Sequence, residues 1–160
     1  MAEGENIFNI NDVDCEPLTN ENSSLLYEAL DKLDDADELE IDKPQLAEFL
    51  GQPQNLAFIA KYHDEACALI YGYTLMSLNS PPQLFIYSVD VIHRFQNNGI
   101  GSKLFQYVVD YSKENGYSEC FVITDKGNKR ACRIYKKAGG KSDYEDEIVY
   151  VIKHNAYSYC

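Results

Sequence analysis

Apolar residues recur at helical spacing in four stretches of the chain. Residues 24–33 carry a stripe of leucine and alanine that a preceding serine can cap. The shorter stretch Lys43–Leu50 has a proline in its first turn and ends at a glycine. Residues 98–115 repeat large apolar side chains every three or four positions, and residues 128–138 do the same up to a pair of glycines. The spacing predicts four amphipathic helices.

β-branched and aromatic residues are concentrated between and around these helices. Two such runs are joined at His63-Asp64, which predicts a hairpin, and a third strong run follows a Pro-Pro break. A nearly continuous apolar run after the third helix is typical of a strand that is covered on both faces. The six predicted strands span residues 7–10, 56–62, 65–78, 84–92, 119–124 and 147–153.

The order of these elements predicts a mixed α/β fold. Strand 84–92, helix 98–115 and strand 119–124 form a crossover unit, and such a unit joins two parallel strands. A chain of 160 residues has the size of one domain. We therefore expect a single domain over residues 1–160.

The composition is that of an ordinary soluble protein, with 45% hydrophobic and 25% charged residues. No apolar run approaches the ~18 residues that a membrane span requires. The first ten residues lack the basic and apolar regions of a signal peptide. The five cysteines show no metal-binding spacing and are expected to be reduced thiols. These features predict a cytoplasmic protein with no membrane partner and no metal ion.

Charge is distributed unevenly along the chain. The net charge is −12, and residues 1–48 hold 15 acidic and 2 basic side chains. Residues 94–141 hold 10 basic and 4 acidic side chains. A nucleic-acid partner is not expected, because neutralising phosphates demands a basic surface. The acidic part suits a cationic ligand and the basic part an anionic one, although solvated faces explain the same charges.

A strand, a polar loop and two glycines lead into the third predicted helix. The loop and the helix start have the sequence Gln96-Asn97-Asn98-Gly99-Ile100-Gly101-Ser102. Glycine lets a ligand approach the backbone, and the unpaired N–H groups of a first helical turn attract phosphate. Glycine also occurs at helix starts for packing reasons. The dinucleotide-binding fingerprint and the P-loop are both excluded by the spacing of the glycines and the lysine.

This loop resembles the acetyl-CoA loop of the GNAT N-acetyltransferase superfamily, which has the pattern [QR]-x-x-G-x-[GA]. Its defined positions are filled by Gln96, Gly99 and Gly101. The superfamily's downstream element, N-x-x-A-x-x-x-Y-x-x-x-G, is matched by Asn128, Ala131, Tyr135 and Gly139. The resemblance covers residues 6 to 154 or so. It implies a twisted, mixed and mostly antiparallel sheet, with a parallel central strand pair splayed around the cofactor and helices on both faces.

Within the superfamily, several short pieces are similar to the aminoglycoside 3-N-acetyltransferase group. They are Ile86-Tyr87, His93-Arg94, Thr124-Asp125 and the acidic segment 143–147. The chain departs from that group at two positions. The group carries an acid where this chain has Ser88, and a small apolar residue where it has Asp90.

The resemblance implies transfer of the acetyl group of acetyl-CoA to a primary amine. An ammonium must lose a proton before its nitrogen can attack, and Asp90 is the only acid on the predicted central strand. Its carboxylate either takes that proton, directly or through water, or only anchors the cation. The Val91 N–H is expected to bind the thioester oxygen, and Tyr135 to protonate or hydrogen-bond the leaving sulfur. The expected acetyl-CoA contacts are Val91, Gln96, Asn97, Asn98, Gly99, Ile100, Gly101, Ser102 and Asn128.

The charge distribution predicts a small polycationic acceptor, an aminoglycoside first and a polyamine second. The acids expected to bind it are Asp34, Asp35, Asp37, Asp143, Glu145 and Asp146. A solubilising acidic face with no ligand is the competing interpretation. Acetylation of an amino acid or a protein amine, or binding of CoA without turnover, also stays open, and so does a homodimer.

Overall fold

A computed structural model describes residues 7–154, which form one five-stranded sheet flanked by four α-helices. The strands lie in sequence order, β1 to β4 pairing antiparallel and β4 with β5 parallel. The strands are β1 (Val13–Pro17), β2 (Asn55–Tyr62), β3 (Glu65–Leu75), β4 (Gln83–Val91) and β5 (Glu119–Val122). The helices are α1 (Ser24–Leu30), α2 (Lys43–Leu50), α3 (Ile100–Glu114) and α4 (Lys129–Lys137), with 3-10 turns η1 (Ile10–Asp12) and η2 (His93–Phe95).

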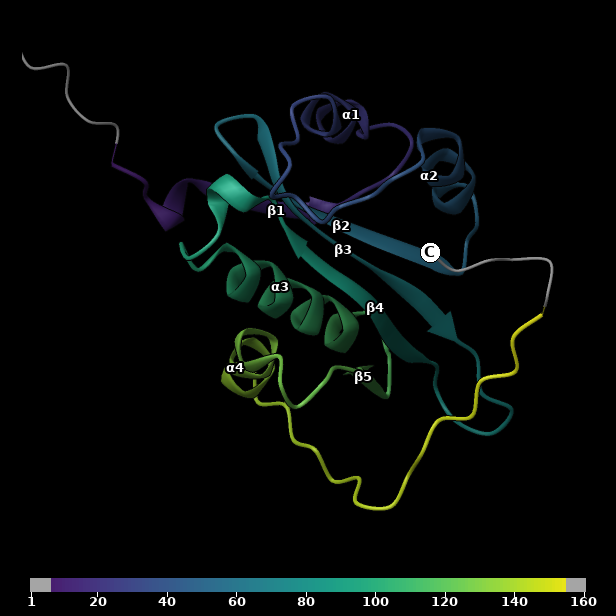
Figure 1. Cartoon of the computed structure of the whole chain (residues 1–160). Coiled ribbons are helices and arrows are strands. Elements are labelled where there is room, and N and C mark those ends of the chain that lie inside the picture. Colours follow the sequence, from purple (N-terminus) through teal and green to yellow (C-terminus); the bar gives the residue numbers. More distant parts are fainter. Residues whose placement is uncertain (1–6, 155–160) are drawn as a thin grey trace, which may run out of the picture.

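The helices cover both faces of the sheet, as predicted (Figure 1). α1 and α2 lie on one face, and α3 lies on the other with α4 beside it. Ile100, Leu104 and Val108 of α3 are buried in the core, which confirms the predicted apolar stripe. The ring of Tyr111 meets that of Phe58 edge to face at 4.9 Å. No helix among residues 7–154 is long and apolar enough to cross a membrane.

The prediction of the first strand is wrong. The sequence placed it at residues 7–10, but Ile10–Asp12 forms the turn η1 and β1 begins at Val13. The side chain of Asn9 accepts the N–H of Asn11 at 3.0 Å, and this local bond caps the turn. A side chain that bonds nearby backbone competes with sheet pairing, so pairing with β2 starts only after the turn. At the other end of this region, α1 stops at Leu30 rather than at residue 33.

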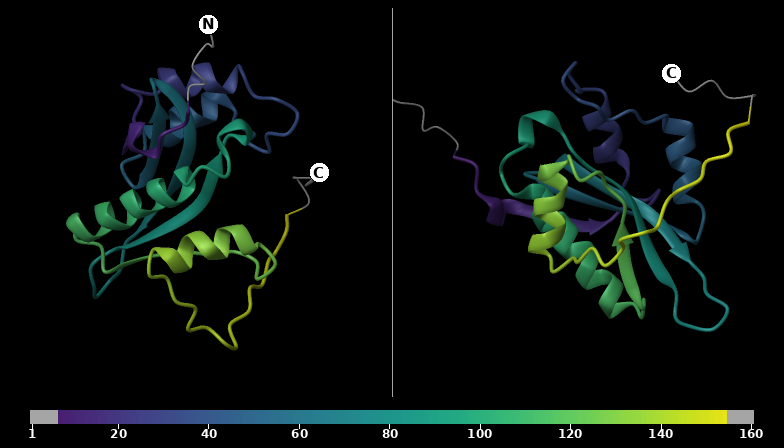
Figure 2. Two further views of the ribbon diagram at one scale, coloured as in Figure 1. Left: turned by 90° about the vertical axis from the view of Figure 1, so that its left-hand side faces the viewer. Right: turned by 60° about the horizontal axis from the view of Figure 1, so that its bottom comes forward.

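The closing strand predicted at residues 147–153 is also wrong. Residues 141–154 continue from α4 as irregular chain (Figure 2), and none of the described strands pairs with them. Ile148 is 69% exposed and Tyr150 is 85% exposed. β-branched residues favour a strand only where neighbours and a core receive their side chains. β5 is therefore an edge strand among residues 7–154. Its first residue is exposed and the other three are only half-buried, which corrects the prediction that it is covered on both faces.

An irregularity in the pairing of β3 with β4 shapes the sheet near its centre. Tyr71 pairs with Ser88 but Gly72 pairs with Ile86, so Tyr87 is an additional residue on β4. The backbones approach so closely here that a Cβ on Gly72 would lie 2.0 Å from the carbonyl oxygen of Phe85. A bulge of this kind re-aims the side chains that follow it.

Replacing Gly72 by Ala should therefore destabilise the fold. The added methyl group meets backbone rather than a movable side chain, so the free energy of unfolding should fall by about 2 kcal/mol or more. Urea denaturation measures this change. Gly127→Ala is the matched control, because a Cβ there has open space. Equal stabilities of the two variants would contradict the close approach.

Candidate active site

The bulge turns two polar side chains of β4 toward the α2 face of the sheet. Ser88 and Asp90 both line a pocket on that face together with Tyr71 of β3. Val91 points the opposite way, toward α3, where its Cγ2 lies 3.3 Å from the position of a Cβ on Gly101. One short stretch of β4 thus reaches both faces of the sheet.

The backbone of β4 is open on one side over the same stretch. Pairing with β5 ends at Ile86 and Val122. The N–H of Ile92 donates to a β3 carbonyl at 2.9 Å, and N–H directions alternate along a strand, so that of Val91 points away from β3. On that side the Val91 carbonyl accepts a hydrogen bond from Nε2 of Gln96 at 2.9 Å. The Val91 N–H is therefore directed into the gap beyond the end of the β4–β5 pairing.

The Asp90 carboxylate is half-buried and strongly hydrogen-bonded. Oγ of Ser88 donates to its Oδ2 at 2.5 Å. Burial raises the pKa of Asp90, the bond from Ser88 lowers it and the nearby charge of Glu38 raises it, so that the pKa is raised overall. A carboxylate with a raised pKa is a better proton acceptor than one on the surface, which is the property a general base needs.

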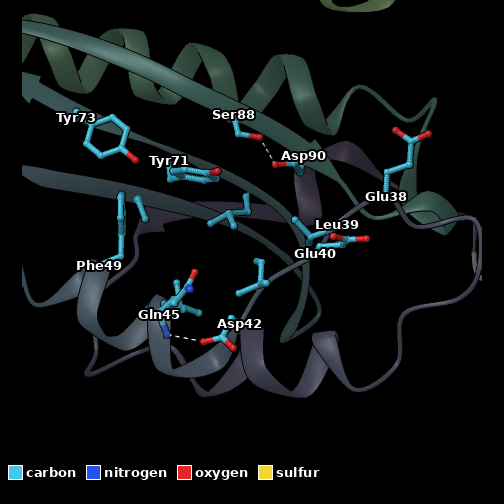
Figure 3. A pocket seen from close by; sticks show the side chains of 14 residues that line it. Glu38, Leu39, Glu40, Asp42, Gln45, Phe49, Tyr71, Tyr73, Ser88 and Asp90 are labelled. Atoms are coloured by element: carbon cyan, nitrogen blue, oxygen red, sulfur yellow. Dashed lines mark hydrogen bonds between the residues drawn. The ribbon is translucent and has the colours of Figure 1, made fainter. Parts of the chain in front are cut away.

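The pocket beside Asp90 combines carboxylates with aromatic rings and has a volume of about 390 Å³. Figure 3 shows Glu38 and Glu40 near the Asp90 end and Tyr73 and Phe49 at the opposite end. Carboxylates attract cations, and the faces of aromatic rings attract them as well. The pocket is lined by Glu38, Leu39, Glu40, Ile41, Asp42, Gln45, Leu46, Phe49, Ala57, Leu69, Tyr71, Tyr73, Ser88 and Asp90.

The acids that the sequence predicted for this pocket lie just outside it. Asp34, Asp35 and Asp37 precede the lining residues Glu38 and Glu40 on the same loop. The carboxylate of Asp37 accepts the backbone N–H of His93 at 2.6 Å and that of Asp34 at 2.9 Å. Asp37 therefore ties the acidic loop to the turn that follows β4. Its role in substrate binding stays a prediction, as does that of Asp34 and Asp35.

The hydrogen bonds that Asp37 accepts also affect the pKa of its carboxyl group. Burial raises the pKa of this carboxyl, but the N–H groups of His93 and Asp34 and the charges of His93 and Arg94 lower it, and the overall pKa is lowered. Asp37 thus stays ionised and keeps its two hydrogen bonds over a wide range of pH.

The second predicted group of acids lies elsewhere. Asp143, Glu145 and Asp146 are exposed on the irregular chain after α4. None of them lines the pocket beside Asp90 or the pocket at the start of α3. The structure does not bring them together with Asp90, and their part in acceptor binding stays a prediction.

The start of α3 has the features that a phosphate site requires. Gly99 caps the helix with a φ of 79°, a conformation that glycine adopts without strain. The helical ladder begins with the N–H of Lys103, which donates to the Gly99 carbonyl at 3.1 Å, so the N–H groups of Ile100, Gly101 and Ser102 point out of the helix end. A pocket of about 800 Å³ adjoins this end, and Gly99, Ser102 and Lys137 are among its lining residues.

Gly101 fits the packing explanation that the sequence left open for its glycines. A Cβ there would lie 3.2 Å from Cδ1 of Ile134 and 3.3 Å from Cγ2 of Val91. Its lack of a side chain therefore lets α3 pack tightly between α4 and β4. The prediction that Gly101 contacts a ligand rests on its N–H group alone.

The side chains of the loop before α3 hold the loop itself. Nδ2 of Asn98 donates to the carbonyls of Phe95 and Gln96, at 3.1 and 3.2 Å. The amide of Gln96 bonds Val91, as described above, and the side chain of Asn97 accepts from Arg130 of α4 at 2.9 Å. These side chains shape the loop, and the backbone N–H of Gln96 is also used within it, donating to the carbonyl of His93 at 3.1 Å. Arg130 stands inside the downstream element, at a position that the motif leaves undefined, so the sequence alone gives no signal for it.

Asn128 and Tyr135 occupy different parts of α4. Oδ1 of Asn128 accepts the N–H of Ala131 at 3.1 Å and caps the helix. Asn128 was predicted to contact acetyl-CoA, and the hydrogen bond that the structure gives it is this structural one. Tyr135 is half-buried, with its ring 4.8 Å from that of Phe105. Burial raises the pKa of Tyr135, and the charges of Cys132 and Asp90 raise it further. The hydroxyl is therefore protonated at neutral pH and can act as a donor.

Comparisons with known proteins identify the fold. The family described as "Acetyltransferase (GNAT) family" matches residues 20–140. No curated protein sequence matches this chain. An aminoglycoside acetyltransferase from an uncultured soil metagenomic sample, solved with trehalose, is 25% identical, with a TM-score of 0.68 over 91% of this chain and 97% of that one.

Two further solved structures carry ligands that their descriptions name. The same metagenomic enzyme in complex with sisomicin is 23% identical over 90% of this chain and 97% of its own, with a TM-score of 0.71. The aminoglycoside acetyltransferase AAC(6')-Iy, bound to a bisubstrate analog, is 17% identical over 89% of this chain and 98% of its own, with a TM-score of 0.68. At these identities the two matches show the fold alone. The predicted similarity to the 3-N group stays a prediction.

Replacing Asp90 by Asn should stabilise the folded protein at neutral pH. The pKa of Asp90 is raised on folding, so the ionised group destabilises the folded state, and stability falls as pH rises through the ordinary Asp pKa of ~3.9 toward the raised value. Asn carries no charge yet still accepts the Ser88 hydroxyl. The melting temperature (Tm) at pH 7 should therefore exceed that of the wild type, and the gain should vanish below pH 4 or so. The exposed control Asp35→Asn should leave Tm unchanged. A lower Tm for Asp90→Asn at pH 7 would rule out this cost of burial.

Proposed function

The chain belongs to the GNAT acetyltransferase family, and we propose that it transfers the acetyl group of acetyl-CoA to a primary amine of a small polycationic acceptor. The observation that carries this proposal is the placement of Val91 and Asp90, neighbours on β4 that reach opposite sides of the sheet. The donor would approach from the α3 side and the amine from the pocket beside α2. The two would meet at the gap in β4.

Acetyl-CoA supplies an activated acyl group as a thioester. The first-turn N–H groups of α3 would bind its diphosphate, and the adjoining pocket of about 800 Å³ has room for the rest of the nucleotide. The N–H of Val91 would donate to the acyl oxygen, where negative charge develops during attack. A donor that is fixed in advance at such a position stabilises the transition state more than water can.

Asp90 is proposed as the general base. An alkyl ammonium is almost wholly protonated at neutral pH, so its proton must leave before the nitrogen attacks. Asp90 lies at the end of the acceptor pocket that adjoins the gap, and its raised pKa favours proton transfer to it. Ser88 holds the carboxylate in place through its hydroxyl.

Tyr135 is proposed to donate a proton or a hydrogen bond to the sulfur that leaves. Its hydroxyl is protonated at neutral pH, as that of an ordinary tyrosine with a pKa of ~10 is, and burial raises its pKa further. A thiolate that is stabilised as it forms leaves more readily.

The acceptor is proposed to be an aminoglycoside first and a polyamine second. Carboxylates of Glu38, Glu40 and Asp42 share the pocket with three aromatic rings, a lining that suits several ammonium groups at once. The 25% identical match is described as an aminoglycoside acetyltransferase. Amino acids and protein N-termini carry fewer positive charges and would use less of this lining.

A thiol-release assay tests the proposed function. The wild type is mixed with acetyl-CoA and, in turn, with aminoglycosides, polyamines, amino acids and peptides, and free CoA thiol is measured. Release that depends on a polycationic amine supports the proposal. Binding of CoA with no release for any amine would instead favour a CoA-binding module without turnover.

Tyr135→Phe should lower kcat by ~10²-fold and leave the affinity for acetyl-CoA unchanged. The substitution removes one hydroxyl and keeps the ring that packs on Phe105. Steady-state kinetics and a thermal melt measure the two effects. Full activity of the Phe variant would make Tyr135 a packing residue only.

Neutralising the pocket wall with Glu38→Gln and Glu40→Gln should raise KM for the amine about 3- to 10-fold at low ionic strength and flatten its salt dependence. Both side chains line the acceptor pocket and neither lines the other one, so KM for acetyl-CoA should not change. The control pair Glu48→Gln and Glu114→Gln removes the same charge from exposed positions outside both pockets. If the two pairs behave alike, the acids act through net charge and not through the pocket.

A further inference from the structure

A cation on α4 joins two side chains of the loop that precedes α3. Nη1 of Arg130 donates to Oε1 of Gln96, and its Nη2 donates to Oδ1 of Asn97, both at 2.9 Å. The planar guanidinium presents these donors in a fixed fork, so it can fix the relative position of two acceptors. The contacts join segments that are more than thirty residues apart in the sequence.

The two residues that Arg130 holds are the ones that set the shape of the loop. Asn97 has a φ of 65°, in the left-handed region that few non-glycine residues other than Asn and Asp adopt. Gln96 reaches on from the guanidinium to the carbonyl of Val91 through its Nε2. One line of hydrogen bonds thus runs from α4 through the loop to the strand that carries Asp90.

The position of Arg130 is unfavourable for α4 itself. It is the second residue of the helix, and a cation near a helix N-terminus opposes the helix dipole. The exposed side chain is also not part of the hydrophobic core. Stability of α4 therefore gives no reason for an arginine at this position, whereas the two contacts to the loop do.

We infer that Arg130 is a positioning residue for the diphosphate-binding loop. This inference rests on the proposed function, because it assigns the loop to acetyl-CoA. By holding Gln96 and Asn97, the guanidinium keeps the loop in its binding shape before the ligand arrives. A loop that is ordered in advance loses less conformational entropy on binding, and the gain appears as affinity. The ligand class that depends on Arg130 is a donor with a diphosphate.

Three variants distinguish a positioning role of the Arg130 guanidinium from an effect of its positive charge. Arg130→Gln removes both the fork and the charge, and Arg130→Lys keeps the charge but loses the fork. Arg133→Gln is the matched control, because Arg133 is an exposed arginine on the same helix with no described contact to the loop. Calorimetry gives the Kd of acetyl-CoA, and hydrogen exchange reports the order of residues 95–102 in the free protein.

Both Arg130 variants should bind acetyl-CoA ~10-fold more weakly than the wild type, and Arg133→Gln should bind normally. Amides of residues 95–102 should exchange faster in the two Arg130 variants, while those of α4 keep their protection. S-acetylpantetheine, a donor without the diphosphate and the nucleotide, should be used equally well by all four proteins. Combining Arg130→Gln with Asn97→Ala should weaken binding less than the two single effects predict, because both break one contact.

Other outcomes overturn the inference. Wild-type affinity in Arg130→Lys would make Arg130 a point charge only, and unchanged exchange of residues 95–102 would show that it does not order the loop. Arg130 variants that match Arg133→Gln in every measurement would remove any role of Arg130. If the wild type itself binds no acetyl-CoA, the proposed function fails before this inference is reached.

Discussion

The pairing of β4 with β5 ends after Ile86 and Val122, and the site depends on that early end. Pairing continued along β4 as far as Val91 would occupy the N–H of Val91 and close the sheet. Because the strands part, the last residues of β4 keep a free edge while β3 holds them in place from the other side. A backbone donor in a rigid strand needs no rearrangement during the reaction, which is what stabilisation of developing charge requires.

The other constraint on β4 comes from β3. The bulge at Tyr87 directs Ser88 and Asp90 to the α2 face, and it is tolerated because Gly72 offers no side chain opposite it. Asp90 is thereby placed where burial raises its pKa. A half-buried carboxylate costs stability, which the apolar core on both faces of the sheet offsets. Such a cost in stability is common at functional sites, where a residue is needed for its chemistry and not for folding.

The sequence predicted the helices and the inner strands well, because their apolar periodicity is determined by the face they bury. α2 has the predicted limits, and α3 and α4 differ from theirs by one or two residues. The closing strand failed because its β-branched residues indicate propensity, whereas a strand also needs a partner. The motif located the loop before α3 and Tyr135, but it did not indicate that the side chains of the loop bind one another.

Contacts between segments that are distant in the chain could not be predicted from the sequence. The acidic run was visible as a charge pattern, yet only the fold shows that Glu38 and Glu40 line the pocket while Asp37 holds the loop to the turn after β4. The bulge at Tyr87 leaves no sign in the alternation of β4, and the fork of Arg130 depends on where α4 packs. Each of these features depends on strand register or on the packing of distant segments. The local pattern of a single sequence does not specify either of them.

The proposed reaction requires the Val91 N–H to donate a hydrogen bond to the acyl oxygen where β4 and β5 part. An NMR comparison of the amide shifts caused by CoA and by acetyl-CoA tests it most directly, because the two ligands differ only in the acetyl group. The amides of Ile100, Gly101 and Ser102 should respond equally to both ligands, while that of Val91 should shift further with acetyl-CoA. A Val91 amide that responds identically to the two would contradict the account.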